Sequence, residues 1–278
     1  MTNLRILIEK FFLAFLRFFP AEFSKNITLK SLKLLYHLRL IKFFAVQQDS
    51  NSNGVVIGNL FFKNRIGIAG GLDKNAEYFH IFGSLGFGFI EVGTITLEPQ
   101  KGNPKPRIFR FPNDKTLVNS LGFNNSGSVK VLANIKKNKH KFDGILGVSI
   151  GKSKNTKTKN AWQDYLHLMD YFFVVADYLA INISSPNTEN LRDFHDESKL
   201  DSLLEAINKL RKEFGSLMPI FVKVSPDIKD SSVEKISEII INQKAQGAIL
   251  TNTTSINRSS LKSSNKDQTG GLSGKPIR

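Results

Sequence analysis

From residue 55 onward, short apolar segments alternate with segments of helical periodicity. The apolar segments are β-branched or bounded by glycine and predict six strands: Ile66–Ala69, Phe87–Val92, Ile145–Ile150, Tyr178–Ile183, Ile220–Val224 and Ala248–Leu250. Helical patterns lie between most of them: Ala76–Leu85, Ser128–Lys139, Trp162–Ala176, Lys199–Phe214 and Ser232–Ala245. Strands that alternate with helices form parallel β/α units, so the sequence predicts an α/β fold.

Each predicted strand ends in a polar or glycine-rich cluster. In chain order the clusters read AGGLDK, EVGTIT, VSIGKSK, NISSPNT, KVSPD and TNTTS. In a (β/α)8 TIM barrel the active site is built at the carboxyl ends of the strands, so these clusters predict a polar site at a barrel mouth. A doubly wound open sheet is the alternative, but no G-x-G-x-x-G turn follows the first strand.

The length of the chain sets a further expectation. A barrel needs eight β/α units and typically about 250 residues. The chain has 278 residues, of which residues 1–45 form a separate N-terminal segment. We therefore expect an incomplete barrel over residues 46–278, with the last two β/α units absent.

Residues 1–45 are both basic and rich in phenylalanine. They hold eight of the 39 Lys and Arg residues, only two acidic residues, and eight of the 23 phenylalanines. Apolar residues from Leu4 to Phe19 recur at helical spacing, Pro20 ends this helix, and a second helix is predicted from about Thr28 to Phe44. The two interpretations are a helical hairpin packed on the main domain and an interfacial membrane anchor. A polar linker, Gln47–Gly54, follows.

Several function classes are excluded or disfavoured. The longest uncharged apolar run of residues 1–45, Phe11–Leu16, is much shorter than the about 20 residues of a transmembrane helix. The absence of cysteine excludes disulfides, iron–sulfur clusters and a cysteine nucleophile. The five histidines share no strand end, so no metal site is expected. The net charge of +15 indicates a polyanionic neighbour, but no nucleic-acid-binding motif accompanies it.

Asparagine is concentrated at the predicted strand ends. The residues are Asn119, Asn124, Asn125, Asn182, Asn187 and Asn252. An amide offers a donor and an acceptor, so a set of amides suits a planar heterocycle whose edge alternates carbonyl and N–H groups. The alternative for each is a turn or cap residue. Lys74 and Lys223 also lie at strand ends, where a solvated lysine is not expected; the alternative for Lys74 is an ion pair with Asp73.

Nine colinear motifs carry a family resemblance. They are AGGLDKN (69–75), IEVGTIT (90–96), PKPRIFR (104–110), NSLGFNN (119–125), GVSIGKSK (147–154), INISSPNT (181–188), FVKVSPD (221–227), TNTT (251–254) and DQTGGLSGKP (267–276). In order and spacing, the chain resembles the class 2, quinone-dependent dihydroorotate dehydrogenases over residues 1–278.

The resemblance implies an FMN-containing barrel that oxidises dihydroorotate to orotate in pyrimidine biosynthesis and passes the electrons to a membrane quinone. Ser185 matches the catalytic base. The matched substrate contacts are Lys74, Asn119, Ser120, Leu121, Gly122, Phe123, Asn182, Asn187, Asn252 and Thr253. The matched flavin contacts are Gly70, Gly71, Leu72, Asp73, Lys74, Thr94, Ser149, Asn182, Lys223, Thr251 and Gly274. Lys223 would stabilise the anionic reduced flavin.

The resemblance also implies that residues 1–45 are a membrane-associating helical pair that forms a quinone tunnel. We therefore expect a peripheral protein on the cytoplasmic side of the cell membrane. The sequence departs from the family at Ser149, where asparagine is usual, so one hydrogen bond to the flavin is expected to be lost. The loops that bind the flavin phosphate are also expected to be missing. The alternative function is therefore a catalytically impaired remnant.

Overall fold

The computed structural model describes residues 2–46, 54–188, 191–215, 218–256, 258–259, 261–264 and 266–277. The predicted linker, Gln47–Gly54, lies outside the described residues except for its last glycine.

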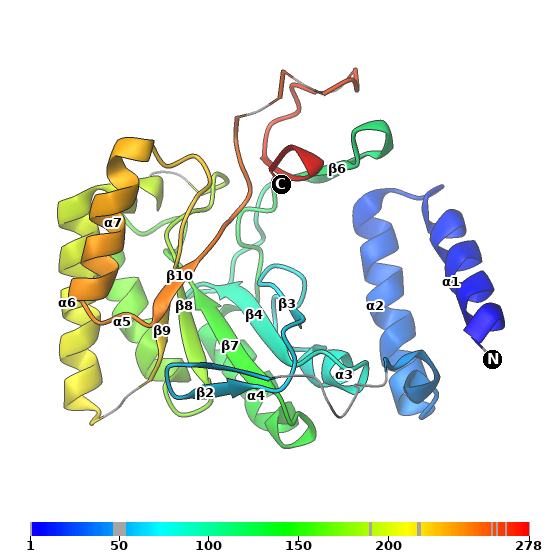
Figure 1. Ribbon diagram of the computed structural model, residues 1–278, viewed down its shortest axis with the longest axis horizontal. Coiled ribbons are helices and arrows are strands. Elements are labelled where there is room, and N and C mark those ends of the chain that lie inside the picture. Colours follow the sequence, from blue (N-terminus) through cyan, green and yellow to red (C-terminus); the bar gives the residue numbers. More distant parts are fainter. Residues whose placement is uncertain are drawn as a thin grey trace.

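A curled, six-stranded parallel sheet forms the centre of the fold, in the shape of a half-barrel (Figure 1). Its spatial order is β10-β9-β8-β7-β4-β3, so each of the six predicted strands is present. The strands are β3 (Gly67–Ile68), β4 (Phe89–Ile95), β7 (Ile145–Ile150), β8 (Tyr178–Asn182), β9 (Ile220–Lys223) and β10 (Gly247–Ile249). The helices that follow them are α3 (Phe79–Ser84), α4 (Gly127–Asn138), α5 (Ala161–Phe172), α6 (Glu197–Glu213) and α7 (Asp230–Asn242).

The larger hydrophobic core lies between the sheet and these helices. Strand residues such as Ile90, Leu146 and Leu179 are fully buried there against helix residues such as Leu168 and Ile207. A second, smaller cluster contains Phe62, Tyr178 and Phe221. The hairpin of β1 (Val55–Ile57) and β2 (Leu60–Phe62) contributes to this cluster. Because both clusters bury strand residues, the strands read as nearly continuous apolar runs.

A three-stranded antiparallel sheet lies beyond the carboxyl ends of the barrel strands (Figure 1). It consists of β5 (Ile108–Phe111), β6 (Thr116–Asn119) and β11 (Gly271–Gly274), in the order β11-β6-β5. The sequence analysis predicted none of these strands. A short helical turn, Pro112–Asp114, and Lys115 in the left-handed region (φ 51°) connect β5 to β6.

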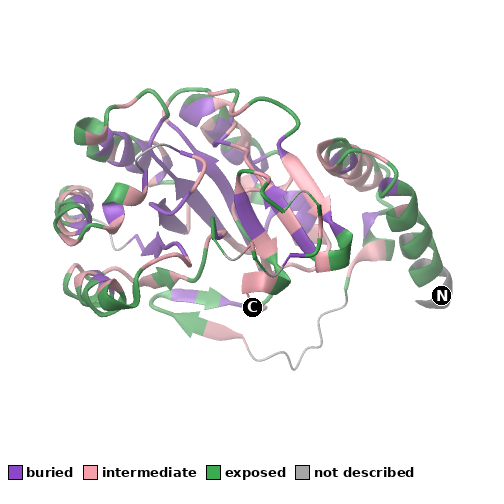
Figure 2. Ribbon diagram, turned by 90° about the horizontal axis from the view of Figure 1, so that it is seen from above, coloured by how far each residue is buried: buried purple, intermediate pink, exposed green. Residues whose placement is uncertain are grey.

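The N-terminal segment forms two helices beside the barrel, α1 (Thr2–Leu16) and α2 (Ala21–His37) (Figure 1). The predicted start of the second helix, near Thr28, is wrong, because α2 begins directly after Pro20. Pro20 is the N-cap residue (φ −53°, ψ 141°), where no helical hydrogen bond needs the N–H group that proline lacks. The predicted end at Phe44 is also too late: Arg39 adopts a φ of 60°, and only a 3-10 turn, Ile41–Phe44, follows. Figure 2 shows how exposed α1 is.

Candidate functional site

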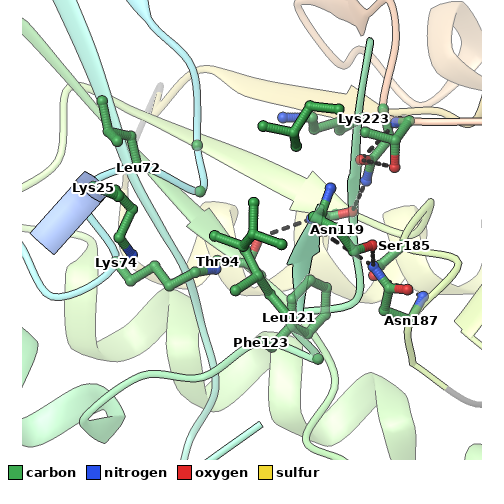
Figure 3. Close-up of a pocket in the computed structure, with 18 of the residues that line it drawn as sticks. Lys25, Leu72, Lys74, Thr94, Asn119, Leu121, Phe123, Ser185, Asn187 and Lys223 are labelled. Carbon is green, nitrogen blue, oxygen red and sulfur yellow. Dashed lines mark hydrogen bonds between the residues drawn. The ribbon is translucent and has the colours of Figure 1, made fainter. Parts of the chain in front are cut away.

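A cavity of about 400 Å³ lies at the carboxyl ends of the barrel strands, where the sequence predicted the site (Figure 3). Residues that follow β3, β8 and β10 line one part of it. The β5–β6 segment and the loop after β6 line another, and α2 contributes Ala21 and Lys25. The volume lies in the usual range for small-molecule sites. Residues far apart in the chain therefore form one enclosure.

Most of the predicted site residues line this cavity together. They are Gly70, Gly71, Leu72, Lys74, Thr94, Asn119, Leu121, Gly122, Phe123, Asn182, Ser185, Asn187, Lys223, Asn252 and Thr253. The predicted strand-end amides behave differently from one another. Asn119, Asn182, Asn187 and Asn252 line the cavity, whereas Asn125 Oδ1 accepts the backbone N–H of Gly127 at 2.8 Å and so has the alternative turn role.

Five predicted site residues do not line the cavity. Asp73 is buried and accepts the backbone N–H groups of Glu77 (2.9 Å) and Tyr78 (2.8 Å), so it orders its own turn instead of pairing with Lys74. Burial raises the pKa of Asp73 to about 6. Ser120 makes backbone hydrogen bonds with Arg107 and Asn103. The other three are the buried Ser149, the exposed Thr251, and Gly274 at the end of β11.

Ser185 lies in the loop after β8 and is 5% exposed. Its Oγ accepts the backbone N–H of Asn187 at 3.3 Å. The Asn187 side chain in turn donates to the backbone oxygen of Asn119 at 3.1 Å, across the cavity wall (Figure 3). The loop that carries the serine is therefore connected to the antiparallel sheet at β6. This network places the Ser185 hydroxyl beside two cavity-lining amides.

A second hydrogen-bond network surrounds Asn182 at the end of β8. Its Nδ2 donates to Thr94 Oγ1 at 2.7 Å, and Thr94 Oγ1 lies 2.9 Å from Ser149 Oγ. Its Oδ1 accepts from Ser184 Oγ at 3.0 Å, which also accepts from Asn252 Nδ2 at 3.0 Å. Buried polar groups that are satisfied in this way are held in fixed orientations. The Ser149 hydroxyl therefore contacts Thr94 and does not line the cavity itself.

The cavity is electropositive. Lys25, Lys74, Arg110 and Lys223 line it, and the described lining residues include no carboxylate. Burial, together with the charges of Lys25, Arg107 and Lys223, lowers the pKa of Lys74 to about 7. Burial also lowers the pKa of Lys25. A nearby anion favours the charged form of such lysines, so an anionic ligand would restore their charge.

Three charged residues at or beside this cavity were not predicted from the sequence. Lys25 of α2 and Arg110 of β5 line it directly, and Glu91 of β4 pairs with Lys223 at 3.4 Å. The motifs IEVGTIT and PKPRIFR contain two of them, but neither motif shows which side chain points inward. Nothing in the local sequence of α2 indicates that Lys25 reaches the barrel mouth.

The histidines have no part in the cavity. Burial lowers the pKa of His80 and of His195 to about 4, so both are neutral packed residues. Within the described part of the chain, no group of three or more His, Cys, Asp or Glu residues is arranged to hold a metal ion.

Comparisons with known proteins agree with this geometry. The family model described as dihydroorotate dehydrogenase matches residues 54–278. Dihydroorotate dehydrogenase (quinone) of Idiomarina loihiensis is 43% identical over 235 residues, covering 83% of this chain and 70% of the relative. The protein of the same name from Neisseria meningitidis serogroup A is 41% identical over 262 residues, covering 92% and 76%.

A solved structure is also similar. The crystal structure of DHODH in complex with ferulenol from Eimeria tenella superposes with a TM-score of 0.78 at 35% sequence identity, over 88% of this chain and 72% of that chain. The half-barrel, the cavity at its strand ends and these sequence matches all lead to one assignment. The chain belongs to the family of quinone-dependent dihydroorotate dehydrogenases.

Proposed function

We propose that the chain oxidises dihydroorotate to orotate with bound FMN, and that a membrane quinone accepts the electrons. One observation carries the proposal: Ser185, four amide side chains and Lys74 line one electropositive cavity. The amides can read the carbonyl and N–H groups of a pyrimidine ring. Lys74 is the cation that would bind the substrate carboxylate.

The residues at the strand ends fit the ring of FMN. Thr94, Asn182 and Lys223 offer a hydroxyl, an amide and a cation to the same cavity, which suits the alternating donors and acceptors along a flavin edge. The backbone at Gly71 (φ 118°) has open space where a side chain would begin, so a flat ring could approach it closely. When bound, FMN supplies the acceptor for the hydride that leaves C6 of dihydroorotate.

Ser185 is assigned as the base that takes the proton from C5. A serine hydroxyl is a weak base, so it passes its own proton on to water as it receives the substrate proton. Its effectiveness depends on placement, which the hydrogen bond from Asn187 N–H provides. Asn119 and Asn187 hold each other at 3.1 Å and would fix the orientation of the ring. The amide network around Asn182 would support the opposite edge.

The N-terminal helices are assigned to membrane contact and quinone access. Among the described residues, no helix combines the length and the apolar composition that a membrane span requires. However, α1 and the segment after it expose several large apolar side chains, among them Phe11 (75% exposed) and Phe18 (86%). An amphipathic helix of this kind binds at the lipid–water interface. We propose peripheral attachment on the cytoplasmic side of the cell membrane.

Quinone access is proposed between α2 and the barrel. Ala21 of α2 lines the cavity together with Ile108 and Leu117 of the antiparallel sheet. These apolar side chains lie on the part of the cavity wall nearest the exposed helices. A quinone ring entering from the membrane would meet them before it reached the strand-end residues.

Purification of the chain tests the proposal directly. We expect the flavin absorption spectrum in the purified protein, and reduction of a soluble quinone analogue that depends on added dihydroorotate. Reduction without dihydroorotate would be the background control. A chain with neither flavin nor dihydroorotate-dependent turnover would contradict the proposed function.

A further inference from the structure

Glu91 connects three other segments of the barrel through one carboxylate. It lies on β4 and is 3% exposed. Its Oε1 accepts the backbone N–H of Gly70 at 3.2 Å and lies 3.4 Å from Lys223 Nζ of β9. Its Oε2 accepts the hydroxyl of Tyr178 of β8 at 3.3 Å. The two oxygens therefore bind groups that follow or belong to β3, β8 and β9.

Two glycines make room for this arrangement. A Cβ atom at Gly70 would lie 2.4 Å from Glu91 Oε1, and one at Gly147 of β7 would lie 2.0 Å from Tyr178 Cζ. Both distances are far below ordinary contact, so a side chain at either position would displace the carboxylate or the phenol. Burial and the charge of Glu91 raise the pKa of Tyr178 well above its ordinary value. Tyr178 thus stays protonated and acts as a donor.

Lys223 lies between two cavities. It lines the site cavity, and together with Glu91 and Tyr178 it lines a second cavity of about 530 Å³. Glu91 is the carboxylate with which it forms an ion pair, at side-chain exposures of 8% and 4%. Among the described residues, Lys223 has no other carboxylate within ion-pair distance. The effective charge that it presents to the site cavity therefore depends on Glu91.

We propose that Glu91 is a positioning residue that fixes the place of the Lys223 ammonium and partly compensates its charge, and thereby sets the reduction potential of the flavin. This inference rests on the proposed function, because it assumes that FMN occupies the site cavity. A cation near the flavin stabilises the reduced, anionic form. Compensation by Glu91 keeps that stabilisation below its maximum. The hydrogen bond from Gly70 N–H holds the carboxylate against the turn after β3, and this turn lines the site cavity.

The test is the reduction potential of the bound flavin in Glu91→Gln, an isostere that keeps the shape but removes the charge. With the Lys223 charge uncompensated, we expect the two-electron equilibrium to shift toward reduced flavin by roughly tenfold, which is about 30 mV in the positive direction. Tyr178→Phe is the matched control, since it removes a hydrogen bond from the same carboxylate but leaves the ion pair. We expect its shift to be less than half as large.

A double variant separates positioning through Lys223 from a direct effect of Glu91. In the Lys223→Met background, the further change Glu91→Gln should alter the equilibrium constant for flavin reduction by less than twofold. The double variant also removes both buried charges, so it should fold even where a single change leaves one charge unpaired.

The outcomes are distinguishable. An unchanged potential in flavin-loaded Glu91→Gln, or a full shift that persists in the Lys223→Met background, would overturn the role of Glu91 while leaving the proposed function intact. Absence of flavin from the unmodified chain would overturn both.

Discussion

Glu22, in the first turn of α2, and Arg107, directly before β5, form a largely buried ion pair with 2.8 Å between Oε1 and Nη2, although 85 residues separate them. Arg107 also donates to the backbone oxygens of Lys101 (2.8 Å) and Asn103 (3.2 Å). Arg110 donates to the backbone oxygens of Leu16, the last residue of α1, and of Phe19 in the segment between α1 and α2. The two arginines therefore attach the N-terminal helices to the antiparallel sheet above the cavity.

Replacing Glu22 with Gln should loosen α1 and α2 from the barrel. The change leaves the Arg107 charge buried without its partner, which costs on the order of 3 kcal/mol for a buried pair. Limited proteolysis should cut first within residues 17–46, and urea unfolding should show the lower stability. Asp143→Asn is the control: it breaks the exposed Lys63–Asp143 pair, which is worth at most about 1 kcal/mol. Equal effects of the two variants would contradict this role.

The same pair predicts release of the helices in acid. Burial would raise the pKa of Glu22, but the hydrogen bond and the charge of Arg107 outweigh it and hold the pKa below its ordinary value of 4.5. A lowered folded-state pKa means that the stabilisation is present above pH 4.5 and is lost as the pH falls through the folded value. We expect proteolysis within residues 17–46 to accelerate below about pH 4.5 in the wild type. In Glu22→Gln it should already be fast at neutral pH.

Replacing Ser185 with Ala should abolish most turnover while flavin stays bound. The substitution removes the proposed base but keeps the backbone of the loop, and loss of a positioned base costs about 10²- to 10⁴-fold in rate. Stopped-flow reduction of the flavin by dihydroorotate measures this step, and a spectral titration with orotate shows that the site still binds. Ser185→Cys should recover part of the rate, since a thiol can accept a proton at the same position. Unchanged reduction in Ser185→Ala would remove the residue from the base role.

Orotate binding should take up a proton above pH 7. Burial and neighbouring cations lower the pKa of Lys74 to about 7, so the free lysine is mostly neutral at pH 8. A bound carboxylate favours the charged form and raises that pKa, so binding protonates the lysine and affinity falls by up to about tenfold per pH unit. Calorimetry in buffers of different ionisation enthalpy measures the uptake. Lys74→Arg, which stays charged, should bind without proton uptake; flat wild-type affinity from pH 7 to 9 would contradict the assignment.

The strands of the parallel sheet could be predicted because each is marked by a pattern within its own few residues. β7, β8 and β9 are short runs of apolar residues that bury both faces. Asn182 at the end of β8 and Lys223 at the end of β9 reach the same cavity because parallel strands end at one edge. The antiparallel sheet was missed because β11 pairs with a strand more than 150 residues earlier, with Gly271 opposite Asn119. No local pattern specifies such a distant pairing. Each strand of the antiparallel sheet is also only four residues long, which leaves little alternation of apolar and polar residues to detect.

The quoted motifs carried most of the residues that line the cavity, but a motif does not show which of its side chains point inward. Ser185, Lys74 and Asn182 belong to quoted motifs, and all three line the cavity. Lys25 reaches the same cavity only because α2 begins at Ala21, a start that was not recognised since Pro20 was interpreted only as a helix end. Glu91 is an acidic residue within an apolar strand, a signal of buried function that the prediction did not use.

Removing two exposed rings from α1 and its end should weaken binding to lipid. Phe11 and Phe18 are 75% and 86% exposed, and burying each ring in a bilayer interface is worth about 1.5–3 kcal/mol. The double change Phe11→Ser and Phe18→Ser should therefore lower partitioning into phosphatidylglycerol-containing vesicles by more than about tenfold. Co-sedimentation measures it. Phe61→Ser is the matched control, because Phe61 is also exposed (55%) but lies on the β1–β2 hairpin. If Phe61→Ser weakened binding as strongly, the membrane surface would not be the one formed by the N-terminal helices.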